Sequence, residues 1–187
     1  TVAGMALGLI AAGKVASRLV ATQAKVIDVD IEEAEQDIAL IDAVITRDAF
    51  IGAKALLDPS QLKEALLCRA EPAAVGITSL GGLVRPVSDK DDFGLHLTFA
   101  KGGRQLLAPM GPGMFAKVEI GKTRLVKFDQ AVKASGPSVI ALDGERERVI
   151  APGQRIEMRI SRRGPWVVDL AATLQRAAKQ KLFLRTN

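Results

Sequence analysis

The sequence predicts a mixed α+β fold that is mainly β. Residues 75–163 contain many short apolar runs, which glycine- and proline-containing turns separate. Helical apolar patterns occur near both ends of the chain. Hydrophobic residues make up 48% of the 187, which is enough for one generous domain or two small ones. Many short strands at such spacing are typical of a sandwich or a closed sheet.

The N-terminal part of the chain is predicted to mix helices and strands. Val2–Val20 is rich in alanine and predicts a helix. Lys25–Ile31 alternates with period two and predicts a strand, whereas Asp37–Thr46 is more continuously apolar and predicts a buried strand. Asp58–Ala65 predicts a short helix, because proline is favoured in the first helical turn.

From residue 75 onward the expected elements are mostly strands. Turn signals such as Gly81-Gly82 and Gly102-Gly103 separate them. The expected strands are Val75–Thr78, Leu83–Val87, Leu95–Phe99, Gln105–Ala108, Phe115–Ile120, Arg124–Phe128, Ser138–Leu142, Glu147–Ile150, Arg155–Ser161 and Trp166–Asp169. A last helix is expected over Leu170–Leu182, with Asp169 as its N-cap.

Composition and charge restrict the partners. The net charge is +5, but aromatic residues are only 4% and no motif has base-reading spacing, so we expect no nucleic-acid partner. Lys14 and Arg18 interrupt the apolar N-terminal stretch, so we expect no membrane span and a cytoplasmic protein. The single Cys68 excludes an internal disulfide and a cysteine-based zinc site, and we expect no metal site. The single His96 lies in an alternating strand, and we expect it to face solvent.

Asp42 interrupts the apolar run Ile38–Ile45. A carboxylate inside a buried strand is unfavourable unless it is paired or faces a ligand. In one interpretation Asp42 is a solvated residue at a strand end. In the other it is a ligand-binding carboxylate, and the sequence leaves both open.

Ala108–Met114 predicts a rigid loop. Pro109 and Pro112 fix φ, while Gly111 and Gly113 permit unusual backbone conformations. The segment is either a plain connection between two strands or a preorganised loop whose amides face a ligand.

Asp143-Gly144 predicts a hairpin turn, because glycine adopts positive φ without steric cost. Glu145, Arg146 and Glu147 follow directly. A hairpin does not normally need three charges behind its turn, so the turn is also a candidate edge of a binding site.

Several of these segments, in this order, resemble the ATP-NAD kinase superfamily, and specifically its acetoin catabolism protein X (AcoX-like) branch. Ala39–Arg47 looks like the family's Asn-Glu/Asp strand motif, with Asp42 on the acidic position and Ile41 in place of the usual Asn. Arg69–Val84 looks like the Thr-Pro-Thr-Gly-Ser stretch that precedes a Gly-Gly pair; the glycine pair is kept and the polar part is replaced. Ala108–Pro112 is similar to the later Pro-x-x-Pro loop.

The match continues at Leu142-Asp143-Gly144, which looks like the family's Asp-Gly hairpin, and it covers about Asp37 to Arg163. The resemblance implies an NAD kinase-like C-terminal β-sandwich-type domain with flanking N- and C-terminal helices that pack on an α/β domain. Residues 1–36 would belong to or contact that α/β domain, 37–164 would form the β-rich domain, and 165–187 would form a closing strand and helix.

The resemblance also implies binding of a nucleotide or dinucleotide, with ATP, an NAD-type nucleotide and Mg as cofactors, and ATP-dependent phosphoryl transfer in the intact protein. Asp42 would contact a ligand hydroxyl. The other implied site residues are Gly81, Gly82, Pro109 and Gly111 for backbone contacts, and Asp143, Gly144, Glu145 and Arg146 at the rim of a cleft or subunit.

The departures from the family weaken the implied kinase activity. The family's catalytic Gly-Gly-Asp-Gly-Thr motif is absent from these residues, and we expect it before Thr1, so no catalytic residue is assigned. The alternative is a non-catalytic ligand-binding or oligomerisation domain. We expect a homo-oligomer in either case.

Overall fold

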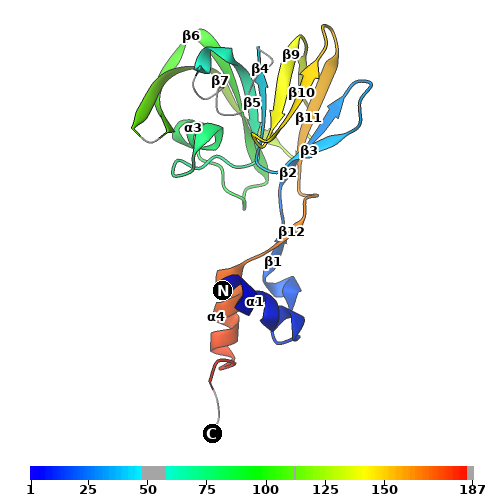
Figure 1. Ribbon diagram of the computed structural model, residues 1–187, viewed down its shortest axis with the longest axis vertical. Coiled ribbons are helices and arrows are strands. Elements are labelled where there is room, and N and C mark those ends of the chain that lie inside the picture. The colour runs from blue at the N-terminus through cyan, green and yellow to red at the C-terminus, as the bar shows by residue number, and fades with distance from the viewer. Residues whose placement is uncertain (48–57, 112, 185–187) are drawn as a thin grey trace. The chain divides into compact units, whose positions relative to one another are not determined.

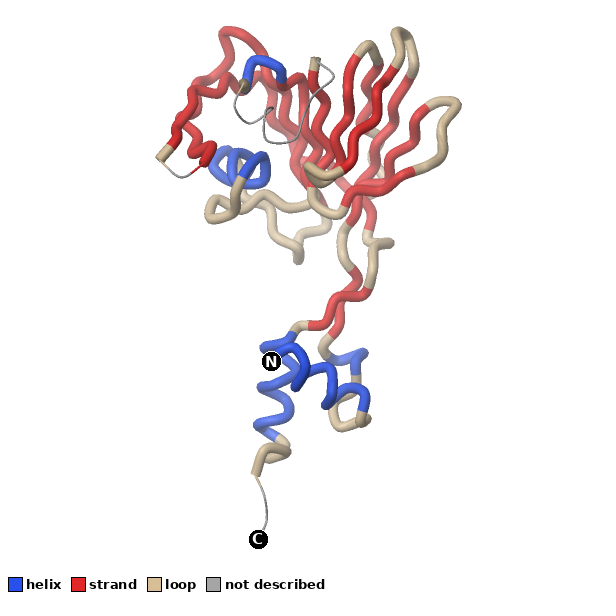
Figure 2. The backbone as a smooth tube through the Cα atoms, in the orientation of Figure 1, coloured by secondary structure: helices blue, strands red, loops and turns tan. Residues whose placement is uncertain are grey.

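The computed structural model describes residues 1–47, 58–111 and 113–184. It divides into two compact units, one formed by Thr1–Ala24 with Gly164–Asn187 and the other by Lys25–Arg163. Strands predominate in the larger unit, whereas the smaller unit is mostly helical (Figures 1 and 2). The predicted fold class, mixed α+β and mainly β, is therefore confirmed.

The smaller unit joins the two ends of the chain. Its elements are α1 (Val2–Ala11), η1 (Ser17–Leu19), β1 (Ala21–Gln23), β12 (Trp166–Val168) and α4 (Leu170–Lys179). Strands β1 and β12 pair antiparallel, and Val15, Val20 and Ala177 form a small buried cluster. Asp169 caps α4 by accepting a hydrogen bond from the Ala172 N–H at 2.8 Å, as its N-cap position predicts. In the described part of the chain, no helix is long and apolar enough to cross a membrane.

The larger unit is built on two antiparallel sheets. The six-stranded sheet has the order β10 (Arg146–Ile150), β9 (Ser138–Leu142), β4 (Asp42–Thr46), β5 (Leu62–Leu67), β6 (Phe93–Gly111) and β7 (Met114–Lys127). The four-stranded sheet has the order β3 (Asp37–Ala39), β2 (Val26–Ile31), β11 (Arg155–Ser161) and β8 (Val132–Ser135). The remaining elements are η2 (Pro59–Gln61) and α3 (Gly76–Val84).

Strands β4 and β9, in the middle of the six-stranded sheet, are buried on both faces. Alternate residues of β4 show this: Ala43 and Ile45 join the core cluster that includes the four-stranded sheet, whereas Val44 joins the cluster that includes Leu80 of α3. Because successive side chains of a strand point to opposite faces, α3 and the four-stranded sheet cover opposite faces. A strand covered on both faces reads as a continuous apolar run, which explains the sequence of β4.

Helix α3 replaces two predicted strands. We predicted strands over Val75–Thr78 and Leu83–Val87 with a Gly81-Gly82 turn between them, and the structure has one helix instead. The turn signal was misleading because the glycines serve close packing. A Cβ on Gly81 would overlap Leu67, and a Cβ on Gly82 would overlap the backbone between Glu71 and Pro72.

Gly82→Ala is expected to destabilise the larger unit by about 2 kcal/mol, because backbone atoms cannot move aside as a flexible side chain can. The measurement is denaturant unfolding followed by far-UV circular dichroism. Gly8→Ala in α1 is the matched control, since a Cβ there meets nothing within 4 Å. Equal stability of the two variants would show that α3 is not packed as closely as described.

Gly103 and Gly121 mark bends within β6 and β7 and not chain reversals. β6 and β7 form one long hairpin, with register shifts between Phe99 and Arg104. A Cβ on Gly103 would overlap the Ile120 carbonyl, and one on Gly121 would crowd Thr98. Glycines at such positions let a two-stranded ribbon bulge and bend.

Two predicted boundaries also differ from the structure. Val26–Ile31 pairs with β11 inside the larger unit, so the units divide at Lys25 and not near residue 37. The helix expected over Asp58–Ala65 is only a 3-10 turn, after which β5 begins at Leu62. The apolar residues of β5 pair with β4 and β6, and this pairing overrides the local helix signal.

Candidate functional site

The turn between β9 and β10 has the conformation that its sequence predicts. Asp143 has φ +56° and Gly144 has φ +68°, and the two strands pair antiparallel on either side. Asp and Gly are the residues that tolerate this left-handed backbone. Glu145 is exposed at the tip, and its N–H donates to the Leu142 carbonyl at 3.1 Å.

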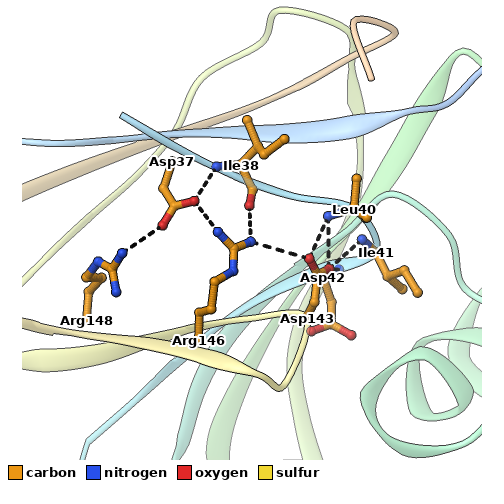
Figure 3. A network of polar contacts seen from close by, with 8 residues as sticks. All are labelled: Asp37, Ile38, Leu40, Ile41, Asp42, Asp143, Arg146 and Arg148. Carbon is orange, nitrogen blue, oxygen red and sulfur yellow. Dashed lines mark hydrogen bonds and ion pairs between the residues drawn. The ribbon is translucent and has the colours of Figure 1, made fainter. Parts of the chain in front are cut away.

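The Asp143 side chain binds backbone amides from a distant part of the sequence. Its carboxylate accepts hydrogen bonds from the N–H groups of Leu40 at 2.9 Å, Ile41 at 2.7 Å and Asp42 at 3.3 Å (Figure 3). These amides form the connection between β3 and β4. The carboxylate therefore holds the start of β4 in place, and little of its acceptor capacity is left for a ligand.

Arg146 is also taken up by internal contacts. It pairs with Asp37, donates to the Ile38 carbonyl and lies 3.7 Å from the Asp143 carboxylate (Figure 3). Arg148 adds a second ion pair to Asp37 at 3.3 Å. Strand β10 is the edge of the six-stranded sheet and β3 is the edge of the four-stranded sheet, so these contacts join the two sheet edges. Asp37 and Arg148 were not among the predicted site residues, although the alternation of Arg146 and Arg148 places these two arginines on one strand face.

Asp42 lies beside this network at the first position of β4 and is only half-buried. Thr78, in the first turn of α3, donates a side-chain hydrogen bond to its carboxylate. Burial raises the pKa of Asp42 to about 6, and the neighbouring Asp143 carboxylate adds to the rise. The N-terminal end of α3 has no side-chain cap, and Thr78 brings the first turn of this helix into contact with Asp42. Thr78 was not among the predicted site residues, because a strand was expected over Val75–Thr78 and Thr78 lies in α3 instead.

The Asp42 carboxylate has hydrogen-bond acceptor capacity to spare. An ionised carboxylate accepts hydrogen bonds only, and Asp42 has one described side-chain partner for its two oxygens. Asp42 lies at a strand end, as the solvated interpretation expects, while its burial and the neighbouring Asp143 carboxylate raise its pKa, as expected for a ligand-binding carboxylate.

The other predicted site residues lie in different places. Gly81 and Gly82 are buried within α3, the helix that carries Thr78, and do not form an exposed loop. Pro109 pairs with Phe115 and Gly111 with Met114, at the end of the β6–β7 hairpin. Asp42 pairs with Leu67 of β5, which in turn pairs with Leu95 near the start of β6. Pro109 and Gly111 lie at the other end of β6, far along the strand from Leu95. Pro112 lies outside the described residues.

His96 is buried and does not face solvent as predicted. Its Nε2 lies 2.7 Å from the Glu64 carboxylate, and its Nδ1 accepts a hydrogen bond from Arg124 Nε at 3.0 Å. The three residues come from β5, β6 and β7. Because Arg124 donates to Nδ1, the ring proton is on Nε2 and points to Glu64. Both ring nitrogens of His96 therefore have hydrogen-bond partners on neighbouring strands.

The described residues do not fit a protein-held metal ion. Among residues 1–47, 58–111 and 113–184, no group of three or more His, Cys, Asp or Glu side chains could hold one. Asp42 and Asp143 alone give two carboxylates, and the second is occupied by backbone amides.

Comparison with known proteins identifies the family of this chain. The model of the acetoin catabolism protein X C-terminal domain matches residues 25–163, which are the larger unit. Acetoin catabolism protein X of Cupriavidus necator is 30% identical over 191 residues, covering 98% of this chain and 53% of that protein. This chain thus spans about half the length of that curated relative.

A crystal structure of yeast NADH kinase complexed with NADH superposes with a TM-score of 0.43 and 11% identity, covering 89% of this chain and 49% of that one. The match to the family model covers most of the chain and coincides with a compact structural unit. The chain belongs to the acetoin catabolism protein X family and carries its C-terminal domain.

Proposed function

We propose that the larger unit binds a nucleotide or dinucleotide, and that the Asp42 carboxylate accepts hydrogen bonds from a ligand hydroxyl such as a ribose hydroxyl. The observation that carries the proposal is the half-buried Asp42 carboxylate beside Asp143. Thr78 and the start of α3 would form the other side of the contact.

The energetics of Asp42 support a functional role. A second carboxylate nearby and partial burial both disfavour its ionised form, which is why its pKa is raised to about 6. Near neutral pH the side chain is nevertheless ionised, so the folded protein holds an unfavourable charge. Carboxylates kept in such environments are concentrated at binding and catalytic sites.

We further propose that, in the longer proteins of the family, this unit takes ATP or an NAD-type nucleotide for phosphoryl transfer. Such catalysis depends on positioning and charge stabilisation, with Mg²⁺ neutralising the phosphates. Because the described residues do not fit a metal site, Asp42 and Thr78 are assigned to binding alone, and none to a catalytic step. The expected homo-oligomer stays a prediction.

Thermal unfolding of this chain with and without ATP or NAD tests the proposal. A ligand present at about 100 times its dissociation constant should add about 2.7 kcal/mol to the free energy of unfolding. We expect a concentration-dependent rise in melting temperature with at least one of the two nucleotides. If neither nucleotide changes the melting temperature, the alternative of a non-catalytic ligand-binding or assembly domain is favoured.

A further inference from the structure

A second cavity lies at the opposite end of strands β4 and β5 from Asp42. Asp42 pairs with Leu67, whereas Thr46, at the other end of β4, pairs with Leu62. Leu62 and the neighbouring Arg47 line a cavity of about 750 Å³. Its other described lining residues are Pro59, Ser60, Gln61, Phe99, Ala100, Lys101, Gln105, Lys117 and Glu119. A volume of this size accommodates a small organic molecule.

The charged side chains that line this cavity are mainly basic. Arg47, Lys101 and Lys117 bring three positive charges, against one carboxylate from Glu119. No ion pair found in the described part of the chain involves any of these three cations. Glu119 is engaged instead with the backbone, because its Oε2 accepts a hydrogen bond from the Gly102 N–H at 3.2 Å. The described residues that line the cavity therefore carry more positive than negative charge.

The backbone positions these charges around one space. Arg47 donates from Nη1 to the Ser60 and Leu62 carbonyls, which fixes its guanidinium at the rim. Glu119 pairs with Gln105 across the hairpin, and Lys117, two residues from Glu119, projects from the same face of β7. Lys101 comes from the irregular stretch of β6 next to Gly102, whose φ is +79°.

The floor of the cavity is apolar. Phe99 is 7% exposed and Leu62 is 1% exposed, and both line the cavity together with Pro59 and Ala100. A site with an apolar floor and a basic rim suits a ligand that has an apolar body and an anionic group. Arginine and lysine together are the side chains that proteins use to bind phosphate.

We propose that this cavity binds a phosphorylated small molecule, whose phosphate lies against Arg47, Lys101 and Lys117 and whose body packs on Phe99. This site is separate from Asp42 and does not depend on the nucleotide proposal, because the two lie at opposite ends of β4 and β5.

The test is a titration of the 187-residue chain with inorganic pyrophosphate at constant ionic strength, followed by amide chemical shifts in nuclear magnetic resonance. We expect saturable shifts of the Gly102, Gln105 and Glu119 amides. Lys101→Ala combined with Lys117→Ala should weaken binding by at least about tenfold, because each removes a charge at the phosphate. Lys122→Ala is the matched control, since it removes an exposed lysine from β7 outside the cavity.

Two outcomes would overturn this proposal: shifts that do not saturate, or equal affinity in the double variant and the control. Pyrophosphate and the lysine variants test this cavity, whereas ATP, NAD and the Asp42 variant test the nucleotide site, so failure of the two proposals is distinguishable.

Discussion

Asp143→Ala is expected to lower the free energy of unfolding of the larger unit by about 3 kcal/mol. Three backbone N–H groups, from Leu40 to Asp42, would lose their acceptor, and Arg146 would lose a neighbouring carboxylate. Alanine at φ +56° adds backbone strain of about 1 kcal/mol. Denaturant unfolding measures the change.

Two companion variants separate these contributions. Asp143→Asn retains one acceptor oxygen and tolerates positive φ, so it should lose less stability than the alanine variant. Glu145→Ala, at the exposed tip of the same turn, should stay within about 0.5 kcal/mol of the parent. If Asp143→Ala and Glu145→Ala are equally stable, the carboxylate does not hold the β3–β4 connection.

Asp42→Asn is expected to have the opposite effect and to stabilise the protein at neutral pH. The pKa of Asp42 is raised from 3.8 to about 6, so ionisation is harder in the folded than in the unfolded state. The resulting penalty is absent below the unfolded pKa, grows as pH rises from about 4 to 6, and is complete above the folded pKa. A pKa difference of about two corresponds to about 3 kcal/mol, which is the upper limit of the gain.

The stability of Asp42→Asn should be compared with that of the parent at pH 3.5 and pH 7.5. We expect equal stability at the lower pH and a more stable variant at the higher pH. Asp30→Asn, which neutralises an exposed aspartate on β2, is the control and should change little at either pH. A destabilised Asp42→Asn variant at pH 7.5 would show that the carboxylate is structural.

Much of the fold follows from local sequence signals. Strands β2, β4, β9, β10 and β11 follow from their apolar patterns, the β9–β10 turn from Asp143-Gly144, and the start of α4 from the Asp169 cap. In each case the physical cause acts within a few residues.

Features that depend on distant partners could not be predicted in this way. The Gly82 backbone lies against Glu71 and Pro72, so a helix appears where the glycines suggested a turn. His96 is buried only because Glu64 and Arg124 lie on neighbouring strands.

The same limit applies to the candidate site. Asp42 was identified because a carboxylate interrupts an apolar run, which is visible in the sequence. The structural role of Asp143 was not visible, because the amides that it binds lie about a hundred residues earlier.

The most direct test of the central claim is calorimetric titration of ATP and NAD into the parent protein and Asp42→Asn at pH 7.5. The variant should bind at least about tenfold more weakly, since it loses a charged acceptor for a ligand hydroxyl. Weaker binding by a variant that is more stable than the parent would show that Asp42 is kept for the ligand. Unchanged affinity would contradict the assignment of Asp42 to the nucleotide site.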